Sequence, residues 1–218
     1  MKLYGSVASP YVARVLLVAK AKGLDLPLAE TPGGGIKSAE YLAINPLGKM
    51  PAFTDDQGRH LPESVVICEY LDETAQGPSL MPTDPYDRAR VRLLCRLVEL
   101  YTMKELGPFF RNRDPAKRNQ AEVATAREAY LSSLKNIEHY LGGGSYACGD
   151  SLTLADCVMY PSFLTSGAVL AAFGMTTQFD GLPKLTRWWQ AMSTHAVAGP
   201  LGKQHLDGFM AFMNAPRA

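Results

Sequence analysis

The segment Val7-Ala8-Ser9-Pro10-Tyr11-Val12 has the residue types and placement that most favour chemistry. It lies between an expected strand, Lys2–Gly5, and an expected helix, Pro10–Lys22. A strand that runs into a helix N-terminus forms an anion site, because free N–H groups and the helix dipole point at it. From spacing alone, the simpler interpretation of Ser9 is an N-cap before Pro10, and a catalytic hydroxyl is the alternative.

The sulfur and imidazole side chains predict no metal site and no disulfide framework. The spacing of the cysteines and histidines matches neither a metal-ligand motif nor a disulfide-rich framework. No Cys-x-x-Cys pair occupies the turn before Pro10, which excludes dithiol redox chemistry at that turn. Few scattered cysteines and no Asn-x-Ser/Thr sequon favour a reducing, cytoplasmic compartment. The residues concerned are Cys68, Cys95, Cys148, Cys157, His60, His139, His195 and His205.

The composition excludes several classes of protein. Of 218 residues, 47% are apolar, so the chain can bury a core and is not of the disordered class. The net charge of +1 lacks the basic field of most nucleic-acid and acidic-membrane binders, so we expect neither partner. Arg14 interrupts the apolar N-terminal stretch, unlike a signal peptide. We expect the apolar stretch Val158–Met175 to be a buried core helix and not a membrane span.

Residues 1–76 alternate between strand and helix patterns in the order β-α-β-α-β-β-α. Pro27 cannot donate to a strand ladder, so we expect the second strand, Leu24–Leu28, to lie at a sheet edge. The other expected elements are strand Lys2–Gly5, helix Pro10–Lys22, a short helix at Ser38–Ile44, strands Met50–Asp55 and Gly58–Leu61, and helix Ser64–Glu73.

The segment Gly77–Pro85 is rich in proline and predicts a linker between two domains. No strand pattern follows it, so residues 86–218 predict an all-helical domain after an α/β domain at residues 1–76. Thr153-Leu-Ala-Asp156 has the spacing of a capping box, which assigns Asp156 a structural role. The expected helices are Tyr86–Leu106, Pro115–Leu141, one from Thr153 onward, and Pro183–Thr194.

Four motifs occur in order along the chain. They are Ala8-Ser9-Pro10-Tyr11 with Arg14, Asn45-Pro46-Leu47-Gly48-Lys49-Met50-Pro51, Glu63-Ser64 leading into Ile67-Cys68-Glu69-Tyr70-Leu71, and Thr153-x-x-Asp156. With them the chain resembles the cytosolic glutathione transferase family over nearly its whole length, nearest in pattern to serine-type tau and zeta members. The resemblance implies a thioredoxin-like N-terminal domain, an all-helical C-terminal domain and a homodimer. The stripe Arg88, Arg92 and Arg96 is consistent with a dimer face.

The resemblance also implies that glutathione is the co-substrate and that Ser9 donates a hydrogen bond to its thiolate. Ser6 and Tyr4 are the alternative donors. Pro51 would follow a cis bond that turns the backbone of Met50 toward the bound tripeptide.

Further glutathione contacts follow from the same resemblance. Glu63 and Ser64 would hold the γ-glutamyl group, and Lys49 could pair with the glycyl carboxylate. Plant-type members carry another lysine where this chain has Ala43, and Lys37 is a candidate substitute.

The second-substrate pocket is expected to involve Tyr11, Tyr101, Phe109 and Arg113, although core packing explains any one of the helical residues equally well. The expected reaction is attack of the thiolate on an electrophilic, apolar small molecule. A glutathione-dependent isomerase or dehalogenase, and a non-catalytic ligand-binding protein, are the alternatives on this fold.

Overall fold

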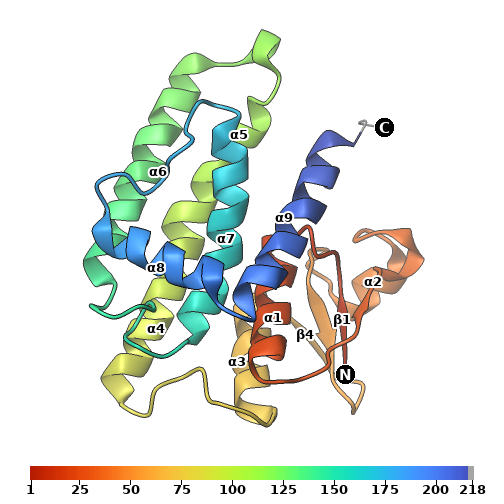
Figure 1. Cartoon of the computed structure of the whole chain (residues 1–218). Coiled ribbons are helices and arrows are strands. Elements are labelled where there is room, and N and C mark those ends of the chain that lie inside the picture. The colour runs from red at the N-terminus through yellow and green to blue at the C-terminus, as the bar shows by residue number, and fades with distance from the viewer. Residues whose placement is uncertain (216–218) are drawn as a thin grey trace. The chain divides into compact units, whose positions relative to one another are not determined.

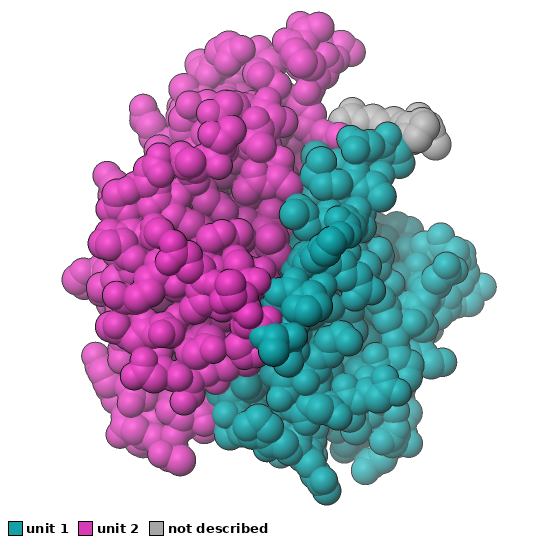
Figure 2. Space-filling model, in the orientation of Figure 1, with its two compact units in different colours: residues 1–80, 196–218 teal, residues 81–195 magenta. Residues whose placement is uncertain are grey.

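The computed structural model describes residues 1–215, which form two compact units (Figure 2). Unit 1 contains Met1–Leu80 together with the segment from Ala196 onward, and unit 2 contains Met81–His195. The C-terminal segment was expected within the helical domain. Instead, its helix packs with the α/β unit.

Unit 1 is built on one four-stranded sheet with the strand order β2-β1-β3-β4. β1 pairs parallel with β2 and antiparallel with β3, and β3 pairs antiparallel with β4. The edge position of β2 agrees with the expectation, but the strand begins after Pro27 and overlaps the expected Leu24–Leu28 only at Leu28. The strands are β1 (Lys2–Tyr4), β2 (Leu28–Ala29), β3 (Ala52–Thr54) and β4 (His60–Pro62).

Four α-helices complete the described part of unit 1, and they confirm the predicted β-α-β-α-β-β-α order with one helix added at the end. In Figure 1, α1 and α3 lie together on one side of the sheet and α2 lies on the other. A short 3-10 turn, Pro32–Gly34, precedes α2. The helices are α1 (Pro10–Ala21), α2 (Ala39–Ile44), α3 (Ser64–Thr74) and α9 (Ala198–Asn214).

Helix α1 is buried more completely than its sequence pattern indicates. The spacing of Val12, Val15 and Leu16 predicts one apolar face, and all three are buried. Ala13 and Leu17, outside that stripe, are buried as well. The reason is tertiary, because α1 packs against both α3 and α9 within unit 1.

The register of the sheet places three chain segments at one end of it. Ala52 pairs with Tyr4 on one side and with Pro62 on the other. Because β3 is antiparallel to both neighbours, its first residue meets the last residues of β1 and β4. The loops that follow Tyr4 and Pro62, and the loop that precedes Ala52, therefore leave the sheet at the same end.

A buried ion pair holds the chain after α3 in unit 1. The Nζ of Lys22 donates to Asp72 Oδ1 at 3.0 Å and to the Pro78 carbonyl oxygen at 3.1 Å. Asp72 Oδ1 also accepts the main-chain N–H of Leu80 at 2.8 Å. Both side chains are buried, with 2% and 4% of their surface exposed, and both are hydrogen-bonded, which is the arrangement that a buried pair requires. The first part of the expected linker is therefore fixed to unit 1.

Unit 2 is all-helical, as expected, but the predicted continuous helix Tyr86–Leu106 is interrupted. A π-helical turn, Val98–Thr102, and a 3-10 turn, Met103–Glu105, separate α4 from α5. Pro108 has no N–H for a regular helical bond, and it is tolerated in the first turn of a new helix. The α-helices are α4 (Pro85–Leu97), α5 (Leu106–Arg111), α6 (Gln120–Tyr140), α7 (Leu154–Ala171) and α8 (Pro183–Thr194).

Helix α7 is the core of unit 2. By length and composition it would pass as a membrane span, with a mean hydropathy of 1.3, but 83% of it is buried inside the folded chain. The apolar stretch is thus a buried core helix, as the sequence predicts.

Asp156 is a buried centre of hydrogen bonding at the start of α7. Its Oδ2 accepts the main-chain N–H and the hydroxyl of Thr153, each at 2.7 Å. Its Oδ1 accepts the Ala147 N–H and the indole N–H of Trp188, each at 2.7 Å. Burial raises the pKa of Asp156 above its ordinary value, against the opposing effect of these four hydrogen bonds. The carboxylate thus joins α7, α8 and the loop before α7.

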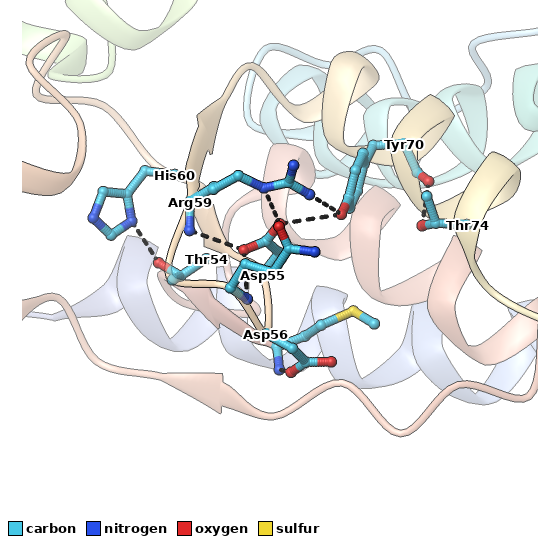
Figure 3. Close-up of polar contacts among 9 residues, drawn as sticks. Thr54, Asp55, Asp56, Arg59, His60, Tyr70 and Thr74 are labelled. Atoms are coloured by element: carbon cyan, nitrogen blue, oxygen red, sulfur yellow. Dashed lines mark hydrogen bonds and ion pairs between the residues drawn. The ribbon is translucent and has the colours of Figure 1, made fainter.

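A second carboxylate organises the turn between β3 and β4 (Figure 3). Asp55 Oδ1 accepts the main-chain N–H groups of Gln57 and Arg59, and Oδ2 accepts Arg59 Nε at 2.6 Å. Tyr70, on α3, donates its hydroxyl to the same Oδ2 at 3.3 Å. Burial alone would raise the pKa of Asp55, but the hydrogen bonds from Arg59 and Gln57 outweigh it and hold the pKa below its usual range.

Replacing Asp156→Ala should lower the free energy of unfolding by about 3–5 kcal/mol, because it leaves buried donors without an acceptor. Denaturant unfolding measures the loss. The control Asp150→Ala changes a nearby exposed carboxylate and should stay within about 0.5 kcal/mol of wild type. Equal stability of the two variants would contradict the assigned role of Asp156.

The lowered pKa of Asp55 predicts a pH-dependent contribution to stability. A folded-state pKa below the unfolded value stabilises the fold above the unfolded pKa, and this contribution is lost as the pH falls through the folded pKa. Asp55→Asn should therefore destabilise the protein at pH 7, and the difference from wild type should shrink below about pH 4. Urea unfolding across this range tests it, with Asp25→Asn, which changes an exposed aspartate, as the control.

Candidate active site

Ser9 lies at the start of α1, but its hydroxyl does not cap the helix. Its main chain has β-region angles, and no capping hydrogen bond from its side chain is present in the described chain. The preceding turn is closed by the Ser9 N–H, which donates to the Ser6 carbonyl oxygen at 2.9 Å. The hydroxyl of Ser6 instead accepts the Ala8 N–H at 3.3 Å. Of the two serines, Ser9 has the hydroxyl that the turn itself does not use.

Met50 and Pro51 lie at the same end of the sheet. The Met50–Pro51 peptide bond is cis, as the resemblance implies. Gly5 permits a close approach here: a Cβ at that position would lie 3.4 Å from Met50 Cβ and 2.6 Å from Val12 Cγ2. The residue that precedes β3 therefore packs directly against the chain leaving β1.

Glu63 and Ser64 form the third segment at this end. Glu63 has φ +67°, and it is the one non-glycine residue with a positive φ among residues 1–215. Such a conformation costs about 1–3 kcal/mol and is most often found at functional sites. Ser64 is buried, and its hydroxyl accepts from Nη1 of Arg14 at 3.3 Å. Arg14 is itself fully buried, and its guanidinium lies over the Tyr11 ring, 4.9 Å from the centroid.

The loop before Met50 is fixed by buried side chains of α2 and the residue after it. Tyr41 and Asn45 both donate to the Lys49 carbonyl oxygen at 2.7 Å, while Lys49 itself is exposed. Lys37 lies close by, because its Nζ is 2.8 Å from the position that a Cβ on Gly48 would occupy. Two ammonium-bearing side chains, Lys37 and Lys49, thus flank this loop.

Among residues 1–215, the starts of α1 and α3 both lack a side-chain cap, although they differ in charge because Glu63 is the N-cap residue of α3 and Ser9 that of α1. In the described structure, neither helix has an acidic residue in its first turn. Ser38, Asp84 and Asn119 cap the starts of α2, α4 and α6, whereas α5, α8 and α9 share the uncapped pattern of α1 and α3 in the described chain. First-turn N–H groups have no intrahelical acceptor, so the uncapped starts of α1 and α3 can receive anions.

The residues predicted for a second-substrate pocket belong to both units. Tyr11 is in unit 1 and partly exposed, and Tyr101 in unit 2 is 50% exposed with the Lys104 ammonium over its ring. Arg113 is half-buried. Phe109 is fully buried and packs edge-to-face on Phe173 at 5.0 Å, so its ring belongs to the core of unit 2, contrary to the expectation of a pocket residue.

One contact at the site was missed from sequence. His205 of α9 is fully buried, and its Nδ1 lies 2.7 Å from the Val7 carbonyl oxygen in the turn before Ser9. The apolar or buried positions Leu201, His205 and Phe209 recur every four residues, and this spacing could have predicted α9. Among residues 1–215, no group of three or more His, Cys, Asp or Glu side chains could hold a metal ion.

The chain matches two family models. Residues 3–79 match the glutathione S-transferase N-terminal domain, and residues 97–196 match the glutathione S-transferase C-terminal domain. These ranges cover most of the chain and leave α9 outside.

Individual relatives agree with the family models. A glutathione S-transferase of Pseudomonas putida is 30% identical over 175 residues, which is 78% of this chain and 76% of the relative. Glutathione S-transferase omega-1 of Mus musculus is 29% identical over 204 residues, with 91% and 78% coverage. A solved maleylacetoacetate isomerase from Methylobacterium extorquens AM1, with bound malonate and GSH, has a TM-score of 0.78 at 25% identity, covering 94% of this chain and 97% of that one. The chain belongs to the glutathione S-transferase family.

Proposed function

We propose that the protein is a glutathione transferase in which a hydrogen bond from the Ser9 hydroxyl favours ionisation of the glutathione thiol. The observation that carries this proposal is the convergence of Ser9, Met50 and Glu63 at one end of the sheet. The relatives named as glutathione S-transferases, and the GSH-bound structural neighbour, support glutathione as the co-substrate.

Thiol ionisation is the chemical task of this site. A free thiol has a pKa of about 8.5, so only a few per cent is thiolate at pH 7. The Ser9 hydroxyl can donate to the sulfur, and the uncapped start of α1 adds a favourable dipole. A hydrogen bond to a charged group contributes about 1.5–3 kcal/mol, which corresponds to a pKa lower by about one to two units.

The remaining groups suit the two carboxylates and the peptide of glutathione. The start of α3 and the Ser64 hydroxyl can hold the γ-glutamyl carboxylate, and the Glu63 carboxylate can pair with its ammonium. Lys49 or Lys37 can pair with the glycyl carboxylate. In the described chain the main chain of Met50 has no hydrogen-bond partner, so it can pair with the tripeptide backbone.

The reaction is then nucleophilic substitution or addition. The thiol proton leaves to solvent, the sulfur forms a bond to an electrophilic carbon, and a leaving group departs or a proton is taken up. We further propose that the protein is a cytoplasmic homodimer and that its electrophilic substrates are apolar. Tyr11, Tyr101 and Arg113 are the candidate contacts for this second substrate.

A glutathione-dependent isomerase is the second candidate, favoured by the likeness to a maleylacetoacetate isomerase. In that reaction glutathione is regenerated, so product analysis separates the two functions. A dehalogenase would release halide and fits the same scaffold. A chain that binds glutathione but turns over none of these substrates would be a ligand-binding protein.

Ser9→Ala should raise the pKa of the bound thiol by about one to two units and lower conjugation at pH 7 about 8- to 25-fold, because a thiol of pKa about 8.5 is still about 3% ionised there. The rate should recover as the pH rises, because the thiol then ionises without help. The thiolate absorbance and the pH profile of kcat/KM with an aromatic halide measure both effects. Ser6→Ala tests the alternative donor, and loss of activity in that variant but not in Ser9→Ala would assign the role to Ser6.

Glu63→Gly should raise the free energy of unfolding by about 1 kcal/mol while weakening glutathione binding, because it relieves the positive φ and removes the carboxylate. The matched variant Glu63→Ala removes the carboxylate and keeps the strained backbone, so it should weaken binding without the gain in stability. Denaturant unfolding and calorimetry distinguish the two. A Gly variant no more stable than the Ala variant would contradict the assigned strain.

A further inference from the structure

Helix α9 contacts the turn that leads into Ser9, although it lies outside both segments that match the family models. The imidazole Nδ1 of His205 lies 2.7 Å from the Val7 carbonyl oxygen, across 198 positions of sequence. A carbonyl oxygen only accepts, so Nδ1 carries the proton and donates it. His205 is 0% exposed, and its partner Val7 is half-buried, so the hydrogen bond is largely shielded from solvent.

The Val7 carbonyl belongs to the central peptide of a four-residue turn. The Ser9 N–H donates to the Ser6 carbonyl oxygen at 2.9 Å and closes the turn. Turn types differ mainly in the orientation of this central peptide, which is therefore its least constrained part. Here both of its ends are held, since Val7 accepts from His205 and the Ala8 N–H donates to the Ser6 hydroxyl.

Gly208 brings the main chain of α9 against the same turn. It lies three residues after His205 and therefore on the same helix face. A Cβ there would stand 3.3 Å from Val7 Cγ1 and 3.5 Å from the Ala8 nitrogen. The turn is thus held by one hydrogen bond and by direct packing on α9.

We propose that His205 is a positioning residue for thiol ionisation, acting through the Val7 carbonyl on the backbone that carries Ser9. The inference rests on the function proposed above for Ser9. Because the Ser9 side chain makes no capping bond of its own in the described chain, the backbone sets where its hydroxyl lies. A donor to a developing thiolate must be held within a few tenths of an ångström of its place to be effective.

Three variants separate positioning from stability. His205→Leu removes the donor and keeps an apolar side chain in the buried space. His205→Asn returns an amide N–H close to the place of Nδ1. Leu201→Ala is the packing control, because Leu201 is buried on α9 one turn earlier and lies with Lys20 near the far end of α1.

His205→Leu should raise the pKa of the bound glutathione thiol by about 0.5–1 unit, which, for a wild-type thiol about one to two units below its free pKa, leaves about 1.5- to 8-fold less thiolate at pH 7. Its affinity for S-methylglutathione, which has no ionisable thiol, should stay close to wild type. His205→Asn should restore the thiol pKa. Leu201→Ala should lower Tm without shifting the thiol pKa. An unchanged pKa in His205→Leu, no rescue by Asn, or an equal shift in Leu201→Ala would overturn the proposal.

Hydrogen exchange on the free protein distinguishes this proposal from the one on which it rests. The Ala8 and Ser9 amides should exchange faster in His205→Leu than in wild type or Leu201→Ala, with no glutathione present. If the wild type binds no glutathione, the proposed function fails, and faster exchange in His205→Leu would still show that His205 holds the turn before Ser9. Unchanged exchange at these amides would show that His205 does not hold the turn.

Discussion

The antiparallel pairing of β3 with both β1 and β4 is the constraint on which the candidate site depends. It puts Ala52 between Tyr4 and Pro62, so three loops far apart in sequence leave the sheet at one end. A register slip of one residue would reverse the buried and exposed faces of a strand, and burial of Leu3 and Phe53 resists it. The sheet core thereby fixes the geometry of a site that contains none of its side chains.

The groups brought together by this register are mostly main-chain groups and helix ends. Two uncapped helix starts and the Met50 backbone offer donors and acceptors that carry no formal charge. This explains how a chain with a net charge of +1 can present a site for an anionic peptide. A site made of main-chain groups also depends on the packing of the elements around it, because these groups keep their direction only where the surrounding backbone is fixed.

Buried charged groups hold each unit together, and each is surrounded by partners. Lys22 and Asp72 fix the chain that leaves α3, and Asp156 joins α7 to α8. Such groups are costly to bury alone and specific once paired, so they select one arrangement of the elements around them. In unit 1, the buried imidazole of His205 makes a comparable contact through a hydrogen bond to the main chain, because its Nδ1 donates to the Val7 carbonyl oxygen in the turn before Ser9.

The sequence by itself determined the order of the elements, the helix Pro183–Thr194 and the role of Asp156, because these follow from local periodicity, proline chemistry and capping. The motifs around Ser9 and Glu63 also identified the segments of the candidate site. Tertiary structure alone decided the rest. The interruption between α4 and α5, the burial of Phe109, the approach of Lys37 to Gly48 and the docking of α9 on unit 1 depend on which surfaces meet, and no local pattern records the neighbour that covers a residue.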